Sequence, residues 1–241
     1  MHILCVIPSR ISSTRLPRKP LLPIQGKPMI QWVYENASRC KLLSDVVVAT
    51  DSKEIASIIK NIGGKYLITD PDLPTGSDRV AAVAEHFPEA DVVINLQGDE
   101  PFIRPHMLEA LVAPYLAGET PDMTTLAYPL DMAKFHDAGT VKVITDVKGN
   151  ALYFSRSPIP YFRTPEIAPV YNHMGLYAFR RDFLLQYTKL PQTPLEKTEA
   201  LEQLRALEHG YKIRVCLTES NTLEINTQEE YDRAQEFIYS D

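Results

Sequence analysis

The sequence predicts an α/β fold, in which a Rossmann-like, mostly parallel sheet is flanked by helices and carries a smaller α+β lobe. Strand-length apolar runs at 3–7, 46–49 and 92–96 alternate with helical patterns. The run 46–49 is apolar at every position, as is typical of a strand buried on both faces of a parallel sheet. After about Thr120 shorter strand-like pieces follow, which indicates an attached lobe.

The helices of the first half are predicted from apolar residues at helical spacing. These stripes are Met29-Ile30-Val33-Ala37-Cys40 and Ile55-Ile58-Ile59-Ile62, the second ended by Gly63-Gly64. Further helices are expected at 77–86 and 105–116. The alternation implies right-handed βαβ units, whose ligands bind beyond the carboxyl ends of the strands. This rule points to the loops after Ile7, Ala49 and Leu96.

The second half is predicted to contain strands, turns and two more helices. The expected elements are strands at 123–128, 141–145 and 151–154, a proline-marked turn at 157–160, a helix at 196–209, a strand at 213–217 and a helix at 228–238. We expect a single domain over residues 1–241, with 1–120 and 190–241 as its core and 121–189 as its lobe.

Composition excludes several classes of protein. The formal net charge of −6 argues against a nucleic-acid-binding surface. No segment approaches the roughly 20 apolar residues of a membrane span, and the first apolar run ends at Pro8, too early for a signal peptide. Cys5, Cys40 and Cys216 lack CxxC spacing, so neither a disulfide framework nor a zinc site is expected. We therefore expect a cytoplasmic protein with no nucleic-acid or membrane partner.

A basic segment opens this acidic chain. Its members Arg10, Arg15, Arg18, Lys19 and Lys27 are the only charged residues among the first 34. Common phosphate-loop, dinucleotide and hydrolase motifs do not occur. Hydroxyls, backbone N–H groups and cations after the first strand suit a triphosphate, because Arg and Lys both pair with phosphate oxygens. The alternative is a solvated basic loop, which is common on protein surfaces.

The string from Arg10 to Leu21 resembles the opening motif R-x-x-S-T-R-L-P-x-K-P-L of the 3-deoxy-manno-octulosonate cytidylyltransferases. Further pieces of that pattern follow in the same order. They are Gly26-Lys27-Pro28-Met29-Ile30, Ala49-Thr50-Asp51, Thr75-Gly76-Ser77-Asp78-Arg79, Asn95-Leu96-Gln97-Gly98-Asp99-Glu100-Pro101, 151–156, 158–161, 173–177 and 201–208. The resemblance spans nearly the whole chain.

The resemblance implies a nucleotidyltransferase that uses Mg²⁺ and CTP to activate an acidic sugar. The anomeric hydroxyl of free 3-deoxy-manno-octulosonate would attack the α-phosphate of CTP, releasing pyrophosphate and giving the CMP-sugar for lipopolysaccharide or capsule synthesis. Such a transfer depends on positioning and charge stabilisation. The resemblance also implies a homodimer built through the lobe, with the core binding nucleotide and the lobe binding the sugar.

The same resemblance assigns roles to single residues. Arg10, Lys19 and Asp99 would be catalytic, with Asp99 as an Mg²⁺ ligand at the end of a buried strand. The nucleotide-binding candidates are Pro8, Arg10, Ser13, Arg15, Lys19, Thr75, Ser77, Arg79 and Gln97; the sugar-binding candidates are Arg156, His173, Tyr177, Glu202 and Gln203. Arg18, where the family often has Gly, is interpreted as a bystander.

Simpler structural roles compete with these assignments. Asp99 alone would be read as a helix cap, and Ser77 with Asp78 as the N-cap of the next helix. Singly, His173 would be a structural histidine, and Glu202 with Gln203 a solvated helix face. The shared order of the motifs favours the functional roles.

One position departs from the family pattern. The family segment V-D-T-P-E-D carries a metal-binding Asp, and here Asn226 stands at that position. An amide oxygen can still ligate Mg²⁺ but brings no charge, so the affinity for metal should fall. Asn226 would also serve as the N-cap of the last helix. We hypothesise that Glu224 or an additional water compensates.

Two other functions stay open at this point. One is the same reaction on a related acid, such as 8-amino-octulosonate, a nonulosonate or a phosphonate. The other is a catalytically weakened homologue that binds CTP.

Overall fold

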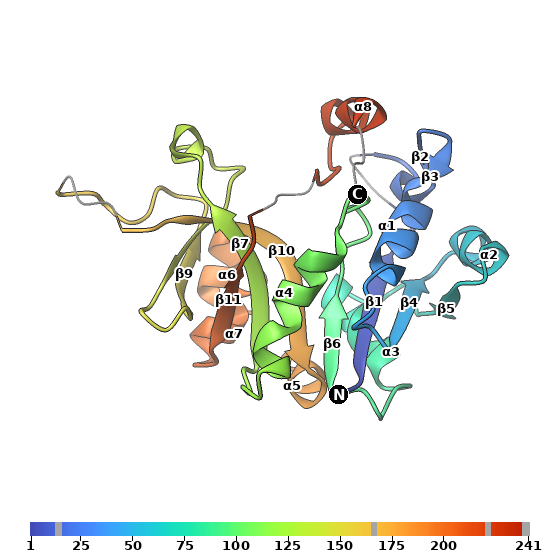
Figure 1. The fold of residues 1–241 in the computed structure, drawn as a ribbon, viewed down its shortest axis with the longest axis horizontal. Coiled ribbons are helices and arrows are strands. Elements are labelled where there is room, and N and C mark those ends of the chain that lie inside the picture. The colour runs from blue at the N-terminus through green and yellow to red at the C-terminus, as the bar shows by residue number, and fades with distance from the viewer. Residues whose placement is uncertain (13–15, 165–167, 220–222, 238–241) are drawn as a thin grey trace. The chain divides into compact units, whose positions relative to one another are not determined.

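The computed structural model describes residues 1–12, 16–164, 168–219 and 223–237. It forms two compact units, the first from Met1–Glu109 and Thr222–Asp241, the second from Ala110–Asn221. This division differs from the expected one, because residues 110–120 and 190–221 belong to the second unit. Figure 1 shows the course of the chain through both. Of the helices within the described residues, none combines the length and apolar character that crossing a membrane requires.

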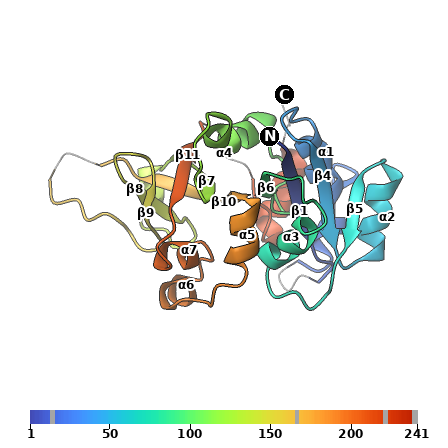
Figure 2. The same ribbon diagram turned by 90° about the horizontal axis from the view of Figure 1, so that it is seen from below.

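The first unit contains a parallel sheet in the order β6-β1-β4-β5, as expected for βαβ units. Its strands are β1 (Ile3–Ser9), β4 (Asp45–Thr50), β5 (Lys65–Ile68) and β6 (Val92–Asn95), and its helices are α1 (Met29–Ser38), α2 (Lys53–Asn61) and α3 (Gly76–Ala84). Figure 2 shows α3 on one face of this sheet and α1 and α2 on the other. The strand β5 was not predicted, because this short edge strand buries none of its residues fully.

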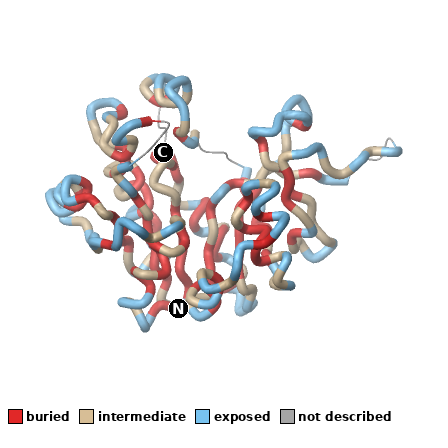
Figure 3. The backbone as a smooth tube through the Cα atoms, turned by 180° about the vertical axis from the view of Figure 1, so that it is seen from behind, coloured by how far each residue is buried: buried red, intermediate tan, exposed pale blue. Residues whose placement is uncertain are grey.

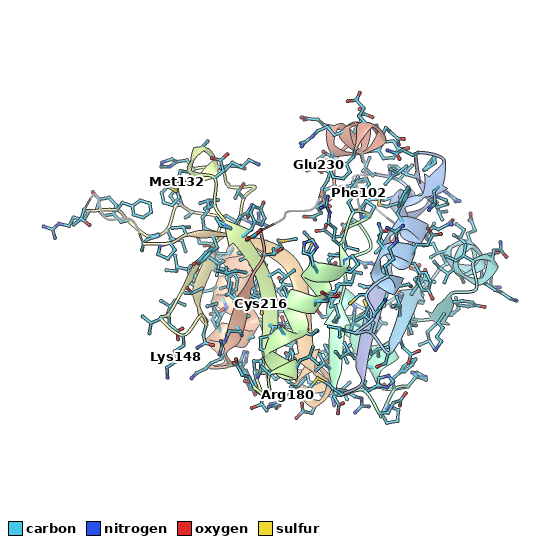
Figure 4. All side chains as sticks on the ribbon, viewed as in Figure 1. Phe102, Met132, Lys148, Arg180, Cys216 and Glu230 are labelled. Atoms are coloured by element: carbon cyan, nitrogen blue, oxygen red, sulfur yellow. The ribbon has the colours of Figure 1, made fainter. Side chains whose placement is uncertain are left out.

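The C-terminal segment of the chain completes the first unit. The helix α8 (Gln228–Glu236) lies beside β2 (Pro23–Ile24), and its Tyr231 hydroxyl donates to the carbonyl oxygen of Pro23. The strand β2 pairs with β3 (Lys27–Pro28) and follows the short helix η1 (Lys19–Leu21). An apolar cluster of Leu16, Ile24, Met29, Phe102, Ile225 and Ala234 joins these segments. Phe102, labelled in Figure 4, packs on Phe237 with ring centroids 4.3 Å apart. This packing fixes where residues 223–227 run.

The second unit is built on β7 (Met123–Pro129). Its neighbours are β11 (Ile213–Leu217), which runs parallel, and β10 (Tyr171–Arg180), which runs antiparallel. β8 (Lys142–Thr145) pairs with β10 and with β9 (Ala151–Ser155). The remaining elements are α4 (Pro105–Leu116), which crosses from the first unit, η2 (Met132–Lys134), α5 (Arg181–Tyr187), α6 (Pro194–Glu199) and α7 (Leu204–Glu208). In both units the buried residues follow the strands (Figure 3).

Two sequence predictions in the C-terminal part need correction. The helix expected over 196–209 is two helices, α6 and α7, because Ala200 adopts a left-handed conformation with φ of 51° and ends α6. The last helix ends at Glu236 within the described residues, whereas 238 lies outside them. The strands predicted at 123–128, 141–145, 151–154 and 213–217 are confirmed to within two residues.

Candidate functional site

The loops after β1, β4 and β6 meet at the carboxyl edge of the first unit's sheet. The N–H of Ile11 donates to Asp51 Oδ1 at 3.2 Å, which ties the loop after β1 to the loop after β4. A Cβ atom on Gly98 would lie only 2.9 Å from the carbonyl oxygen of Pro8. Glycine is therefore required at position 98, because it lets the loop that carries Asp99 approach β1 so closely.

Lys19 lies at the centre of a polar cluster in the first unit. Its ammonium group donates to Asp99 Oδ2 at 2.7 Å, to the carbonyl oxygen of Ile225 at 3.0 Å and to Asn226 Oδ1 at 3.2 Å. These partners come from the loop after β6 and from the segment before α8. The structure thus brings together three residues expected to act on the phosphates and the metal, namely Lys19, Asp99 and Asn226.

Main-chain N–H groups of the segment 223–227 bind it to the loop that carries Asp99 and to α8. The N–H of Ile225 donates to the carbonyl oxygen of Asp99 at 3.1 Å, and the N–H of Asn226 donates to Glu230 Oε2 at 2.7 Å. Thr227, not Asn226, caps α8, since its hydroxyl accepts from the N–H of Glu230. The capping role expected as the alternative for Asn226 therefore falls to Thr227, and the Asn226 side chain faces Lys19 instead.

The donor set of this cluster fits a hard divalent cation. Asp99 Oδ1 is buried and has no hydrogen-bond partner, which is a costly state unless a cation or water satisfies it. The amide oxygen of Asn226 and the carboxylate of Glu224 are further oxygen donors of the kind that Mg²⁺ takes. Within the described residues no group of three His, Cys, Asp or Glu side chains is arranged to hold a metal by itself. A cation held here would therefore also need an oxygen such as that of the Asn226 amide.

The electrostatic setting of Glu224 reflects its neighbours. Desolvation of its carboxyl group raises the pKa of Glu224, and the negative charge of Asp99 raises it further. The Asn226 hydrogen bond and the charge of Lys19 act in the opposite direction. Glu224 nevertheless stays accessible to solvent.

The candidates for base and ribose contacts are linked by Asn95, which was not among the predicted site residues. Asn95 is buried at the end of β6; its Nδ2 donates to Ser77 Oγ at 3.4 Å, and its Oδ1 accepts from Gln97 Nε2 at 3.0 Å. Asn95 therefore orients both side chains. Thr75 is the N-cap of α3 and forms a capping box with Asp78, so the cap expected at Ser77 belongs to Thr75.

The basic candidates of the first unit differ in exposure. Arg10 is exposed, whereas Arg79 is buried and its guanidinium group donates to Thr69 Oγ1. Burial lowers the pKa of Arg79. Arg18 forms an exposed ion pair with Glu54, which agrees with its interpretation as a bystander. Ser13 and Arg15 lie outside the described residues.

In the second unit, Arg156 is held by its main chain and side chain together. Its N–H donates to Glu199 Oε2 at 2.9 Å, and its Nε donates to the carbonyl oxygen of Glu199 at 2.9 Å. The buried ammonium of Lys142 donates to the carbonyl oxygen of Arg156 at 2.5 Å. Neither Glu199 nor Lys142 was identified from the sequence, because each looks like a solvated charge in its local context.

His173 and Tyr177 are brought together by a bulge in β10. Met174 and Tyr177 pair with consecutive residues of β7, so Gly175 and Leu176 are extra. The ring centroids of His173 and Tyr177 lie 5.6 Å apart, whereas four residues of regular strand span about 13 Å.

The buried hydroxyl of Thr125 on β7 holds this bulge in place. Its single proton serves a carbonyl oxygen, that of Leu176 at 2.9 Å or that of Met174 at 3.2 Å, so we assign Nε2 of His173, 3.0 Å away, as a donor to the hydroxyl oxygen. This assignment makes the ring the Nε2–H tautomer, and burial lowers the pKa of His173 to about 3. The imidazole is thus neutral, with Nδ1 as an acceptor.

Gln203 and Glu202 come from the turn before α7. The hydroxyl of Tyr177 donates to Gln203 Oε1 at 3.0 Å, and Gln203 Nε2 is buried without a hydrogen-bond partner. The hydroxyl of Tyr187 donates to the carbonyl oxygen of Glu202 at 2.7 Å. The second unit therefore brings together a neutral imidazole, a phenol and a buried amide, and it also carries the guanidinium of Arg156. These groups suit a carboxylated polyol. The expectation of a solvated helix face is wrong for Gln203, which is buried.

Comparisons with known proteins show which family the chain resembles. The family model described as cytidylyltransferase matches residues 4–213. A 3-deoxy-manno-octulosonate cytidylyltransferase of Acaryochloris marina is 56% identical over 99% of this chain and 98% of its own length. One of Synechococcus elongatus is 52% identical over 97% of each chain. The solved structure of a CMP:2-keto-3-deoxy-manno-octonic acid synthetase complexed with CTP superposes with a TM-score of 0.93, at 41% identity and 98% coverage of each chain.

The chain belongs to the cytidylyltransferase family, and within it to the 3-deoxy-manno-octulosonate cytidylyltransferases. The fold is more widely shared. A 4-diphosphocytidyl-2C-methyl-D-erythritol synthase of Anaerococcus prevotii superposes with a TM-score of 0.64 at 16% identity, which is a likeness of fold alone.

Proposed function

We propose that this enzyme transfers the cytidylyl group of CTP to the anomeric hydroxyl of 3-deoxy-manno-octulosonate, in the cytoplasm, where CTP is made. The hydroxyl oxygen forms a bond to the α-phosphorus, the bond from that phosphorus to pyrophosphate breaks, and the hydroxyl proton is lost. The CMP-sugar would serve lipopolysaccharide or capsule synthesis. The observation that carries the proposal is the Lys19, Asp99 and Asn226 cluster in a chain with full-length relatives of this activity.

The first unit would bind CTP and Mg²⁺. Arg10 and Lys19 are placed on the loop after β1, where their charges would neutralise the leaving pyrophosphate, together with Ser13 and Arg15. Asp99 and Asn226 would hold Mg²⁺, which when bound withdraws electron density from the phosphate oxygens. Pro8, Thr75, Ser77, Arg79 and Gln97 would complete the nucleotide site.

Recognition of cytosine rests on Gln97 in this proposal. Because Gln97 Nε2 donates to Asn95, its Oε1 is left as an acceptor for the 4-amino group of cytosine. Uracil presents a carbonyl oxygen at that position, so it would leave the Gln97 oxygen unpaired. Discrimination against UTP follows from the same argument.

The second unit would bind the acidic sugar. Arg156 is the cation for its carboxylate, and His173, Tyr177, Glu202 and Gln203 are partners for its hydroxyl groups. The neutral state of His173 supports this role, since Nδ1 of a neutral ring can accept a hydrogen bond from a sugar hydroxyl group. The unpartnered Nε2 of Gln203 is a donor that such a ligand would satisfy.

The test is the release of pyrophosphate from CTP over a panel of acids at saturating Mg²⁺. We expect release with 3-deoxy-manno-octulosonate and much less with 8-amino-octulosonate, a nonulosonate or a phosphonate. Release of pyrophosphate with another acid, and none with 3-deoxy-manno-octulosonate, would contradict the proposed sugar substrate. Binding of CTP without turnover of any acid, restored by Asn226→Asp, would instead show a weakened CTP-binding homologue.

We also propose that the enzyme is a homodimer built through the second unit. Leu152 on β9 is 59% exposed and Tyr161 is 89% exposed, so both leave apolar surface in contact with water. A second copy of the chain would cover these side chains. Light scattering should give a dimer mass for the parent and a monomer for Leu152→Lys with Tyr161→Lys, and a monomeric parent would refute the assembly.

A further inference from the structure

Glu224 contacts the side chain that departs from the family pattern. Asn226 Nδ2 donates to Glu224 Oε1. Ile225 between them is fully buried in the apolar cluster, while Glu224 is exposed and Asn226 partly exposed. The buried Ile225 and its bond to the Asp99 carbonyl therefore fix the place of both polar side chains.

This contact decides which end of the Asn226 amide faces the cluster. With Nδ2 bound to Glu224, Oδ1 is turned toward the Lys19 ammonium, 3.2 Å away. Only the oxygen end of an amide can ligate a cation, because the NH₂ group is a donor without a lone pair for the metal. An Asp at this position would need no such orientation, since its two oxygens are equivalent.

The distribution of negative charge around the cluster also indicates a role for Glu224. One oxygen of Asp99 is bound by Lys19, and the other is buried without a partner. Asn226 adds no negative charge to this pair, whereas the Glu224 carboxylate lies one hydrogen bond further out and remains accessible to an arriving ion. A second carboxylate is thus present beside the cluster, displaced by one side chain.

We propose that Glu224 is a positioning residue for the divalent cation, which turns the Asn226 oxygen toward the metal and supplies the negative charge that Asn226 lacks. The inference rests on the proposed use of Mg²⁺. It explains how a chain without the usual second carboxylate retains a metal site: Glu224 and Asn226 together do what one Asp does in the family pattern.

The test uses Mn²⁺ as a spectroscopic probe of the full chain. Free Mn²⁺ is measured by electron paramagnetic resonance during a titration without nucleotide, for the parent and for Glu224→Gln, Glu224→Ala and Glu229→Gln. Glu229→Gln is the matched control, because it removes one exposed carboxylate from the first turn of α8. The same variants are then assayed for the Mg²⁺ concentration that gives half-maximal synthesis.

We expect Glu224→Gln to weaken Mn²⁺ binding about 10-fold, since ligand charge sets affinity at such sites. Glu224→Ala should weaken it further, because the amide also loses its orienting partner. Glu229→Gln should bind as the parent does. Adding Asn226→Asp to Glu224→Gln should restore the parent's affinity, since the carboxylate then stands at position 226 itself.

Two results would overturn the inference. Equal losses in Glu224→Gln and Glu229→Gln would show a general charge effect, and parent-like binding by Glu224→Gln would show that Glu224 has no part in the site. In both cases the proposed use of Mg²⁺ would stand. A parent that binds no Mn²⁺ and makes the CMP-sugar without divalent cations would refute the metal proposal as well, which separates the two failures.

Discussion

Lys19 carries more of the candidate chemistry than any other single side chain that the structure describes. Its ammonium binds Asp99, Asn226 and the carbonyl oxygen of Ile225, while its neighbour Arg18 pairs with Glu54 on the surface. These two adjacent cations therefore have different functions. The sequence alone does not distinguish Arg18 from Lys19, because both are cations in the same segment. The residues that they bind in the structure distinguish them.

Replacing Lys19 tests this difference. We expect Lys19→Met to lower kcat/KM for CTP at least about 100-fold, because a positioned cation at a leaving phosphate stabilises developing charge. Arg18→Gln is the control and should remain within a factor of about two, since an exposed ion pair contributes little. Steady-state kinetics would measure both. Similar losses in the two variants would mean that only the general charge of the loop matters.

His173 should make stability depend on pH. The ordinary pKa of 6.5 applies to the unfolded chain, and the folded value is about 3. Between these pH values the unfolded state holds one more proton than the folded state. The contribution of His173 to the free energy of unfolding is therefore fully present above pH 6.5, and it decreases by about 1.4 kcal/mol for each unit by which the pH falls below that value.

Urea unfolding at pH 7.5, 6 and 5 measures this dependence. His173→Gln keeps a donor for Thr125 and has no titrating ring, so its slope should be shallower than the parent's by that amount. His86→Gln, which changes an exposed histidine, should keep the parent's slope. An unchanged slope in His173→Gln would contradict a neutral, buried ring.

At the scale of elements, two irregular features were not predicted from the sequence, namely the break between α6 and α7 and the bulge in β10. The run Glu196 to Glu208 consists of good helix formers apart from Thr198, yet Ala200 takes a left-handed conformation. The bulge in β10 breaks the alternation of apolar and polar residues, so no strand was predicted over 171–180. Both features determine where sugar-binding candidates lie. They form because tertiary contacts, such as the hydrogen bond from the Thr125 hydroxyl to the carbonyl oxygen of Leu176, override the local conformational preference of the chain.

A substitution at Ala200 tests the free-energy cost of its left-handed conformation. A left-handed conformation costs an alanine about 1 kcal/mol relative to glycine. We therefore expect Ala200→Gly to raise the free energy of unfolding by up to about 1 kcal/mol. Ala110→Gly, in the interior of α4, should lower it by a similar amount. Chemical denaturation of both variants gives the signs, and a destabilised Ala200→Gly would refute the explanation.

At the scale of the whole molecule, the sequence predicted the parallel sheet well and the division of the chain poorly. Buried runs such as 46–49 identify central strands, and their carboxyl ends locate the loops that carry Lys19 and Asp99. The division depends on pairing between distant segments. β11 joins β7 across more than 80 residues, and no local pattern reports such a partner.

Ile225 should couple the stability of the first unit to its activity. Ile225→Ala removes a fully buried side chain and should lower the free energy of unfolding by about 2–5 kcal/mol. Because the same segment holds Asn226 and Glu224, kcat/KM should fall with it. Ile225→Val should cost about 1 kcal/mol and keep most of the activity. Full activity in a destabilised Ile225→Ala would contradict the coupling.

The cluster around Lys19 also has a consequence for folding. It joins Lys19 to Asp99 across 80 residues of chain and to Asn226 across 207. Contacts between positions so far apart in the chain carry a high entropic cost of loop closure, so they form late. The parallel sheet can form before this cluster does, and activity should be the last property to return when the unfolded enzyme is refolded.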